Sequence, residues 1–269
     1  MLVSAAGGVA CATCMLLACS LSVSTSGLSG GDVPAQQGEG GDVSVPAAEG
    51  GIDAAGDGGP DAARDPSLVS ELLFEDPPGS LMARDTSGFE RHGFLQSNAT
   101  FAADGVRGHA LAVTGTGFVV VEGLAGPLFP RTGTLSLWFR CAKTAVEDVQ
   151  RSVFDSYATD RAHIFMRHAN GAPQNEFQMA MQPRASQYVA VRGVIVLPDT
   201  WTHLVMTWDE ANGQAAFYAN GVLLERSPYD APFAPTDQLF RIGEGLVGGI
   251  DELRLYDRVL SDAEATKLD

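Results

Sequence analysis

The 269-residue chain contains few cysteines and almost no lysine. Three of its four cysteines lie within the first 19 residues, which leaves Cys141 alone in the rest of the chain. No disulfide can therefore form within that remainder, and its stability has to come mainly from a hydrophobic core. Only two of the 17 basic residues are lysines, and 33 acidic residues bring the net charge to −16. Because an acidic surface repels phosphate backbones, we expect no nucleic acid partner.

Patterns that hold nucleotides, zinc or a reactive thiol are also missing. No phosphate-cradling glycine-rich loop precedes a helix, which argues against nucleotide binding. The five histidines are scattered without a His-x-His spacing, and one cysteine follows residue 66, so we predict no zinc site. That cysteine, Cys141, ends a strand-like run, which favours a buried and inert thiol.

The first 19 residues are apolar and small, and polar low-complexity sequence follows at once. This run is too short for a membrane-spanning helix and is typical of a signal peptide. Leu16-Leu-Ala-Cys19 resembles a bacterial lipobox, which predicts that Cys19 is acylated and that the protein is an exported lipoprotein of the outer membrane or cell surface. The alternative is an ordinary secretory signal, cut nearby, and a secreted protein.

Residues 20–66 are rich in Gly, Ser, Ala, Pro, Asp and Glu. Residues 20–63 contain seven acidic residues and no basic one. Such a segment cannot bury enough apolar surface to offset its chain entropy, so we predict a disordered tether. A flexible chain of about 45 residues has a root-mean-square span of roughly 35–40 Å.

Residues 67–269 form the predicted folded domain, which is all-β. Strand-like runs alternate with turn residues at the intervals of a β-sandwich, and Asn212-Gly213 and Asn220-Gly221 predict two hairpin turns. The predicted strands are Leu68–Phe74, Gly93–Leu95, Ala110–Val113, Gly117–Glu122, Thr134–Cys141, Ser152–Ser156, Ala162–Arg167, Glu176–Met181, Gln187–Val191, Trp201–Trp208, Gln214–Ala219, Val222–Arg226 and Gly249–Tyr256.

The residues within these strands indicate which face is buried. From Thr134 to Arg140, Leu135, Leu137 and Phe139 share one face, and Trp138 lies on the other. After the last strand, Ser261 and Glu264 have the spacing of a capping box, which predicts a short C-terminal helix.

Five landmarks in order resemble the LamG-like jelly-roll domains of the concanavalin A-like lectin/glucanase superfamily. The resemblance implies an antiparallel two-sheet jelly-roll β-sandwich with a short C-terminal helix. The landmarks are Phe74-Glu-Asp76 with Asp85-Thr-Ser-Gly88, Gly105-Val-Arg-Gly-His-Ala-Leu111, Gly133-Thr-Leu-Ser-Leu-Trp-Phe-Arg140, Thr200-Trp-Thr-His-Leu-Val-Met-Thr-Trp208 with Tyr218-Ala-Asn-Gly221, and the closing Gly249-Ile-Asp-Glu-Leu-Arg-Leu-Tyr256.

The resemblance also implies a structural Ca²⁺ held between the first and last strands. Alternation along the last strand predicts that Asp251 shares the inward face of Leu253 and Leu255, and a buried carboxylate needs charge-assisted partners. A calcium ion would satisfy it, with Glu75, Asp76 and Asp85 as co-ligands. The alternative is that Asp251 accepts hydrogen bonds from a neighbouring turn.

We expect no catalytic residues. Glycosidases need two carboxylates that flank one bond, whereas Asp251 and Glu252 are adjacent and point to opposite faces of a strand. The sequence thus predicts a non-catalytic, surface-displayed module that binds a carbohydrate or a protein. The alternatives are a structural or adhesion protein and, less favoured, a glycan-cleaving enzyme. The candidate ligand-binding residues are aromatic or planar polar: Trp138, Tyr157, His163, Arg167, Gln178 and Tyr188.

Overall fold

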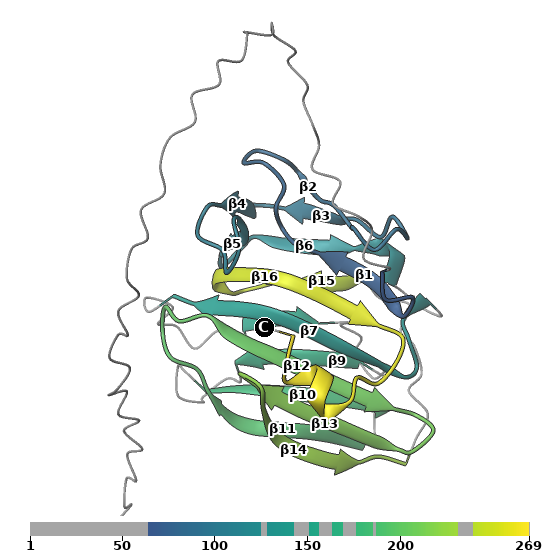
Figure 1. Cartoon of the computed structure of the whole chain (residues 1–269). Coiled ribbons are helices and arrows are strands. Elements are labelled where there is room, and N and C mark those ends of the chain that lie inside the picture. The colour runs from purple at the N-terminus through teal and green to yellow at the C-terminus, as the bar shows by residue number, and fades with distance from the viewer. Residues whose placement is uncertain are drawn as a thin grey trace, which may run out of the picture. The chain divides into compact units, whose positions relative to one another are not determined.

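The computed structural model describes residues 64–124, 128–142, 151–155, 163–168, 176–184, 187–230 and 239–268 (Figure 1). The predicted signal peptide with Cys19, almost all of the predicted tether, and Tyr157 lie outside these residues. Within the described part of the chain, no helix is long and apolar enough to cross a membrane.

The described strands form two antiparallel sheets, which are stacked face to face (Figure 1). In spatial order, the first sheet contains β14 (Val222–Pro228), β13 (Gln214–Ala219), β12 (Thr202–Asp209), β7 (Gly133–Cys141), β16 (Val247–Tyr256), β5 (Ala110–Thr114) and β4 (Thr100–Ala102), and β1 (Leu68–Leu72) also pairs with β16. The second sheet contains β11 (Gln187–Ile195), β10 (Glu176–Arg184), β9 (His163–His168), β8 (Arg151–Asp155), β15 (Phe240–Ile242), β6 (Phe118–Val121), β3 (Gly93–Gln96) and β2 (Met82–Ala83).

The core lies between the sheets and follows the alternation of the strands. Leu135, Leu137, Leu253 and Leu255 are all at most 2% exposed, as the sequence predicts. They belong to one cluster of buried side chains contributed by both sheets. The all-β sandwich that the sequence predicts is therefore confirmed.

A column of aromatic rings crosses the core from one sheet to the other. Trp208 of β12 stacks on Phe129 at 5.6 Å between ring centroids, Phe129 contacts Phe240 of β15 at 6.0 Å, and Phe240 stacks on Phe154 of β8 at 6.1 Å. The indole N–H of Trp208 donates to the carbonyl oxygen of Pro130 at 2.9 Å. The column therefore joins the interior of the first sheet to the two strands at the middle of the second.

The short C-terminal helix α1 (Asp262–Ala265) covers part of the outward face of the first sheet (Figure 1). It begins with the predicted capping box of Ser261 and Glu264. Its Ala265 is fully buried against Val205, Ala216 and Tyr218. A helix this short is held by packing on the sheet and by its cap, because isolated short helices are marginal in water.

A β-bulge changes one prediction about the last strand. Glu252 has a φ of +51°, and the pairing between β16 and β7 shifts between Asp251 and Arg254. The extra residue places Asp251 opposite Trp138, on the outward face, whereas Leu253 and Leu255 point into the core. The prediction that Asp251 shares the face of these leucines is therefore wrong.

Three short strands were not predicted from the sequence: β2, β4 and β15. Each has two or three residues, too few for an alternating pattern to stand out.

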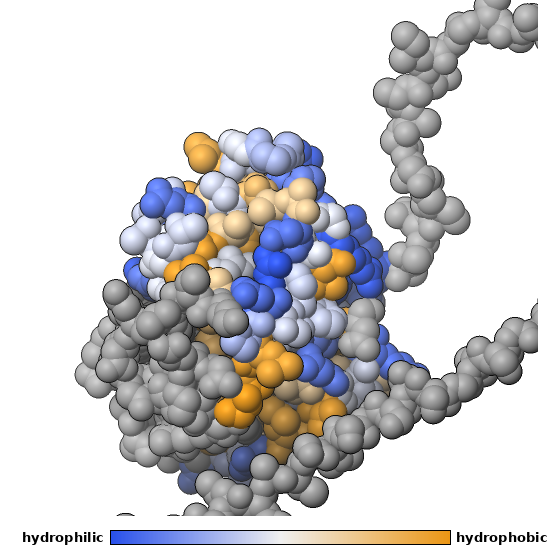
Figure 2. All heavy atoms as spheres, turned by 90° about the vertical axis from the view of Figure 1, so that its left-hand side faces the viewer, coloured by the Kyte–Doolittle hydropathy of each residue, from blue (hydrophilic) through white to orange (hydrophobic). Residues whose placement is uncertain are grey.

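The edge strand β14 was predicted, and it exposes Val222, Leu223 and Leu224. Figure 2, which views the molecule from the left side of Figure 1, shows apolar surface in the lower part of that face.

Candidate ligand-binding face

The outward face of the second sheet carries a row of paired residues across β3, β6, β15 and β8. Phe94 is registered opposite Val120, Val120 opposite Arg241, and Arg241 opposite Asp155. The neighbours of Arg241 along β15, Phe240 and Ile242, belong to the core. Because successive side chains of a strand alternate, Arg241 and its partners in the row point away from the core.

Arg241 is a polar residue of this face that two neighbouring side chains contact. Its Nη1 atom donates to both carboxylate oxygens of Glu244, at 2.8 and 3.0 Å. Its guanidinium also lies 5.6 Å from the ring centroid of Phe118. The side chain is 36% exposed. Two neighbours thus hold a planar, partly accessible donor group in one orientation, which is the arrangement that recognition of a hydroxylated ligand requires.

Exposure differs along the outward face on the two sides of Arg241, whose cross-strand neighbours are Val120 and Asp155. Phe94 is 41% exposed and therefore offers a ring edge or face to solvent. Towards the other end of the sheet, Asp155, Gln178 and Ala180 are almost fully buried although they are on the outward side. The accessible part of this face is consequently centred on β3, β6 and β15. Asp155 on β8 lies at its border, and Gln178 lies two strands further away, on β10.

The predicted ligand-binding residues divide between the two sheets. His163 and Arg167 lie on β9, Gln178 on β10 and Tyr188 on β11, all in the second sheet. Arg167 is registered opposite Gln178. Trp138 lies on β7 of the first sheet, so the predicted residues do not form one site. Sequence reasoning missed Arg241, because the three-residue run of Phe240 to Ile242 is too short for its alternation to distinguish a strand from a loop.

The carboxylate of Asp251 is occupied by a turn at residues 104–109. It accepts hydrogen bonds from the backbone N–H groups of Val106 at 2.8 Å and Arg107 at 3.3 Å, and from Glu252 at 2.8 Å. Asp251 is fully buried. Burial raises its pKa to about 6, although these hydrogen bonds act in the opposite direction. The sequence allows either a calcium ion or hydrogen bonds from a neighbouring turn at Asp251, and these contacts are the hydrogen bonds from the turn.

The three predicted co-ligands each have other partners. Glu75 accepts from the backbone N–H of His109 at 3.0 Å, and Asp76 accepts from Arg84 at its backbone N–H and at Nε, at 2.8 and 3.0 Å. Asp85 accepts from the backbone N–H groups of residues 71, 87 and 91 and from the hydroxyl of residue 87.

These contacts do not fit a four-carboxylate calcium site. Only Glu75 and Asp251 share a turn, and that turn presents three N–H donors to them, the polarity that repels a cation. In the described part of the chain, no three Asp, Glu, His or Cys side chains gather around a point. Calcium binding stays a prediction from the resemblance.

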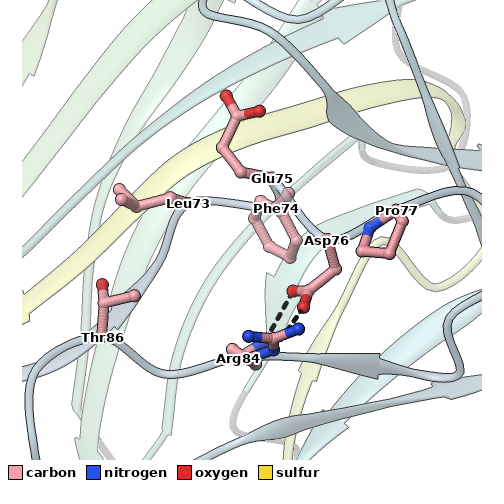
Figure 3. A pocket seen from close by; sticks show the side chains of 7 residues that line it. All are labelled: Leu73, Phe74, Glu75, Asp76, Pro77, Arg84 and Thr86. Atoms are coloured by element: carbon pink, nitrogen blue, oxygen red, sulfur yellow. Dashed lines mark hydrogen bonds and ion pairs between the residues drawn. The ribbon is translucent and has the colours of Figure 1, made fainter. Parts of the chain in front are cut away.

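A small pocket lies beside this region, next to the end of β1 (Figure 3). Its volume is about 170 Å³, and the ion pair of Asp76 with Arg84 crosses one side of it. Phe74, which lines it, has a φ of +56°. Pockets for small organic ligands usually exceed about 300 Å³. This pocket is therefore too small to be the main ligand site.

Replacing Asp251 with Asn should destabilise the fold in a pH-dependent way. An amide has one acceptor oxygen in place of two, so at least one buried N–H loses its partner, at a cost of about 1–3 kcal/mol at pH 7.5. In the wild type, the pKa of Asp251 is 3.8 in the unfolded chain and about 6 in the folded protein. Because the folded protein holds the proton more tightly, the contribution of Asp251 to stability falls as the pH rises from about 4 to about 6. Asn does not titrate, and the loss of stability should therefore be larger at pH 4 than at pH 7.5.

Urea unfolding at both pH values measures this difference. Asp257→Asn, at an exposed position, is the matched control and should change stability little at either pH. An Asp251→Asn variant with the same loss at both pH values would contradict the raised pKa.

Comparison with known proteins is consistent with this fold. A family model described as the concanavalin A-like lectin/glucanases superfamily matches residues 114–266. No curated protein matches the chain.

Solved structures with similar folds include several binding domains. Domain 4 of AbnA, a GH43 extracellular arabinanase from Geobacillus stearothermophilus, solved in complex with arabinotriose, is 20% identical with a TM-score of 0.61, and the match covers 75% of this chain and 98% of that one. The binding domain of Paraclostridial Mosquitocidal Protein 1 is 13% identical (TM-score 0.61; 75% of this chain, 51% of that one), and the binding domain of botulinum neurotoxin serotype D is 15% identical (TM-score 0.59; 74% and 50%). The chain thus spans about half the length of the latter two. At these identities the likeness is one of fold.

Proposed function

The chain belongs to the concanavalin A-like lectin/glucanase superfamily, and from that premise we propose that it is a non-catalytic module that binds a carbohydrate on the outward face of its second sheet. The observation that carries the proposal is the guanidinium of Arg241, held by Glu244 and Phe118 in the same row as the exposed ring of Phe94. The arabinotriose complex of the similar arabinanase domain supports the choice of ligand class.

The chemistry of this face suits a sugar. A pyranose or furanose ring presents C–H groups that pack on an aromatic ring, and hydroxyls that need oriented donors and acceptors. Phe94 and Phe118 supply aromatic surface, and the remaining N–H groups of Arg241 are the donors that we assign to the hydroxyls. The carboxylate of Glu244 holds Arg241 in place and can accept from a neighbouring hydroxyl.

The state of the nearby acids supports a non-catalytic role. Hydrolysis of a glycosidic bond needs one carboxylic acid and one carboxylate, both open to the substrate. Here Glu244 is engaged by Arg241, and Asp155 is 3% exposed. Neither is placed to act as a free acid or nucleophile.

We also propose that the module is displayed on the outside of a bacterial cell. The lipobox-like sequence that ends at Cys19 supports a lipid anchor in the membrane, and the acidic, low-complexity segment 20–66 supports a flexible connection. Such an arrangement lets one anchored domain search a volume around its attachment point for a glycan.

A glycan array followed by calorimetric titration tests the proposed function. We expect at least one neutral glycan to bind the purified protein, and we expect Arg241→Ala and Phe94→Ala each to weaken that binding tenfold or more. Arg131→Ala is the matched control, because Arg131 also donates to both carboxylate oxygens of one glutamate, Glu210, on a different part of the surface.

Two results would contradict this proposal. One is an array without reproducible binding by a protein that is folded by circular dichroism. The other is binding that Arg131→Ala weakens as much as Arg241→Ala does. Capture of an envelope protein in the absence of any glycan binding would favour a structural or adhesion role.

A further inference from the structure

The first sheet carries a second surface with the features of a ligand site, on the face opposite its core. Two of the three tryptophans of the chain, Trp138 and Trp201, lie here and are half-buried. Trp138 is registered between Asp251 of β16 and His203 of β12. Arg140 follows two residues later on the same face of β7, opposite Gly249. None of these residues belongs to the face around Arg241.

Trp201 lies flat across neighbouring strands. The guanidinium of Arg140, on the adjacent β7, is 5.0 Å from its ring centroid. A Cβ atom on Gly249 would come within 2.8 Å of the indole Cη2 atom and 3.3 Å of Cζ2, so the ring reaches over β7 to β16. The indole can take this position because residue 249 has no side chain.

Trp138 is held in a similar way. Its ring stacks on the imidazole of His203, with 4.9 Å between centroids and 30° between planes. His203 is itself 1% exposed, and its Nε2 atom is 2.8 Å from the hydroxyl oxygen of Ser136. A ring fixed on one side loses little conformational entropy when a ligand packs on its accessible part.

Covered regions adjoin these rings on two sides. On the β16 side, the turn at residues 104–109 covers Asp251 through the N–H groups of Val106 and Arg107. On the other side, helix α1 buries Val205 and Tyr218 of the next row. The rings of Trp138 and Trp201 therefore form the part of this face that the turn and the helix leave accessible.

The charge of this surface favours an uncharged ligand. Arg140 forms an ion pair with Asp104, in addition to its contact with Trp201. The pair supplies hydrogen-bond donors and acceptors without a net charge. Flat indole rings beside a neutralised guanidinium suit the C–H face and the hydroxyls of a neutral sugar better than a phosphate or a carboxylate.

We propose that Trp138, Trp201 and Arg140 form a second carbohydrate site, which binds a neutral sugar by stacking. The inference goes beyond the proposed function because it uses different residues on the other sheet, and either site can exist without the other. With both, one domain holds two sugar units on opposite faces of the sandwich and can cross-link glycan chains. Two linked binding events also raise avidity without a new contact.

Tryptophan fluorescence of the full chain gives a direct test. Trp208, the third tryptophan, is buried in the core, so a sugar-dependent change reports on Trp138 and Trp201. Arabinotriose, xylotriose, cellotriose and laminaritriose are the probes. We expect at least one to change the emission, and we expect Trp138→Ala and Trp201→Ala each to weaken its binding at this site tenfold or more.

Two further variants separate a binding role from a structural one. Gly249→Ala should displace the indole of Trp201 and weaken the same binding, although it removes no atom of the site. Trp138→Phe should retain part of the affinity because a smaller ring remains. Urea unfolding of each variant identifies any that has lost its fold, and only folded variants are scored.

The outcomes separate this site from the one around Arg241. Arg241→Ala should leave the fluorescence titration unchanged, and Trp201→Ala should leave binding at the Arg241 face unchanged. If no probe alters the fluorescence of the folded protein, or if the folded Trp138→Ala and Trp201→Ala variants bind as the wild type does, the second site does not exist. Loss of binding in Arg241→Ala alone would then leave the proposed function standing without it.

Discussion

Trp208→Ala should lower the free energy of unfolding by about 3–5 kcal/mol, because it removes the largest fully buried side chain of the core. The loss has two physical parts. The indole leaves a cavity next to Phe129, and the carbonyl oxygen of Pro130 loses its donor. Because the aromatic column continues to Phe240 and Phe154, the strands that carry Arg241 and Asp155 lose support as well.

Thermal unfolding followed by circular dichroism measures this effect. For a domain of about 200 residues, 3–5 kcal/mol corresponds to a decrease in Tm of roughly 6–20 °C. Trp201→Ala is the control, because it deletes the same side chain at a half-buried position and should cost about 1 kcal/mol or less. Equal losses of stability in the two variants would contradict the prediction that the aromatic column stabilises the core more than a half-buried tryptophan does.

Gly248→Ala should cost about 3 kcal/mol, for a reason found in the backbone of the first sheet. A Cβ atom at residue 248 would overlap the carbonyl oxygen of Arg140 on the neighbouring strand. That atom cannot move away without opening the pairing between β16 and β7 at the middle of the sheet. The φ of +155° at this position adds to the strain, since residues with side chains rarely adopt it.

Gly115→Ala separates the two causes. Gly115 also has a positive φ, of +92°, but an added Cβ there would have its nearest neighbour at 3.6 Å, an ordinary contact. Its cost should be the backbone term alone, about 1–2 kcal/mol. Chemical denaturation of both variants gives the comparison, and a Gly248→Ala protein no less stable than Gly115→Ala would show that the overlap is relieved cheaply.

The sandwich could be predicted from sequence because burial and alternation agree along its long strands. Leu135, Leu137 and Phe139 on one side of β7 determine which face is inside, and an Asn-Gly turn fixes the hairpin that follows β12. The short β15 gave no such signal in isolation. Its central residue, Arg241, has two core neighbours, but a three-residue run can belong to a strand or to a loop.

The position of Asp251 could not be predicted because it depends on a bulge. Strict alternation places it inside, and one extra residue at Glu252 moves it to the outward face. Bulges depend on which residues the partner strand offers, here Trp138 and Ser136, and a single strand does not contain that information.

For the candidate sites, too, sequence reasoning predicted features of a single strand but not contacts between strands that are far apart in the sequence. Sequence reasoning identified Trp138 as an outward-facing aromatic residue. It could not show that Trp201 would lie across β7 beside it, because this depends on the missing side chain of Gly249 on a third strand. It also grouped Trp138 with Arg167 and Gln178, which belong to the other sheet. Sheet membership depends on the order of strands in space.

The strand order determines when folding can finish. Among the described strands, β16 is the last in sequence, and it lies between β7 and β5 and also pairs with β1, the first. Until β16 pairs with them, β7 and β5 each present an unpaired edge, and the aliphatic layer of the first sheet stays open to water. A chain that lacks Val247–Tyr256 therefore cannot close the core of the first sheet, although every other strand of that sheet is present.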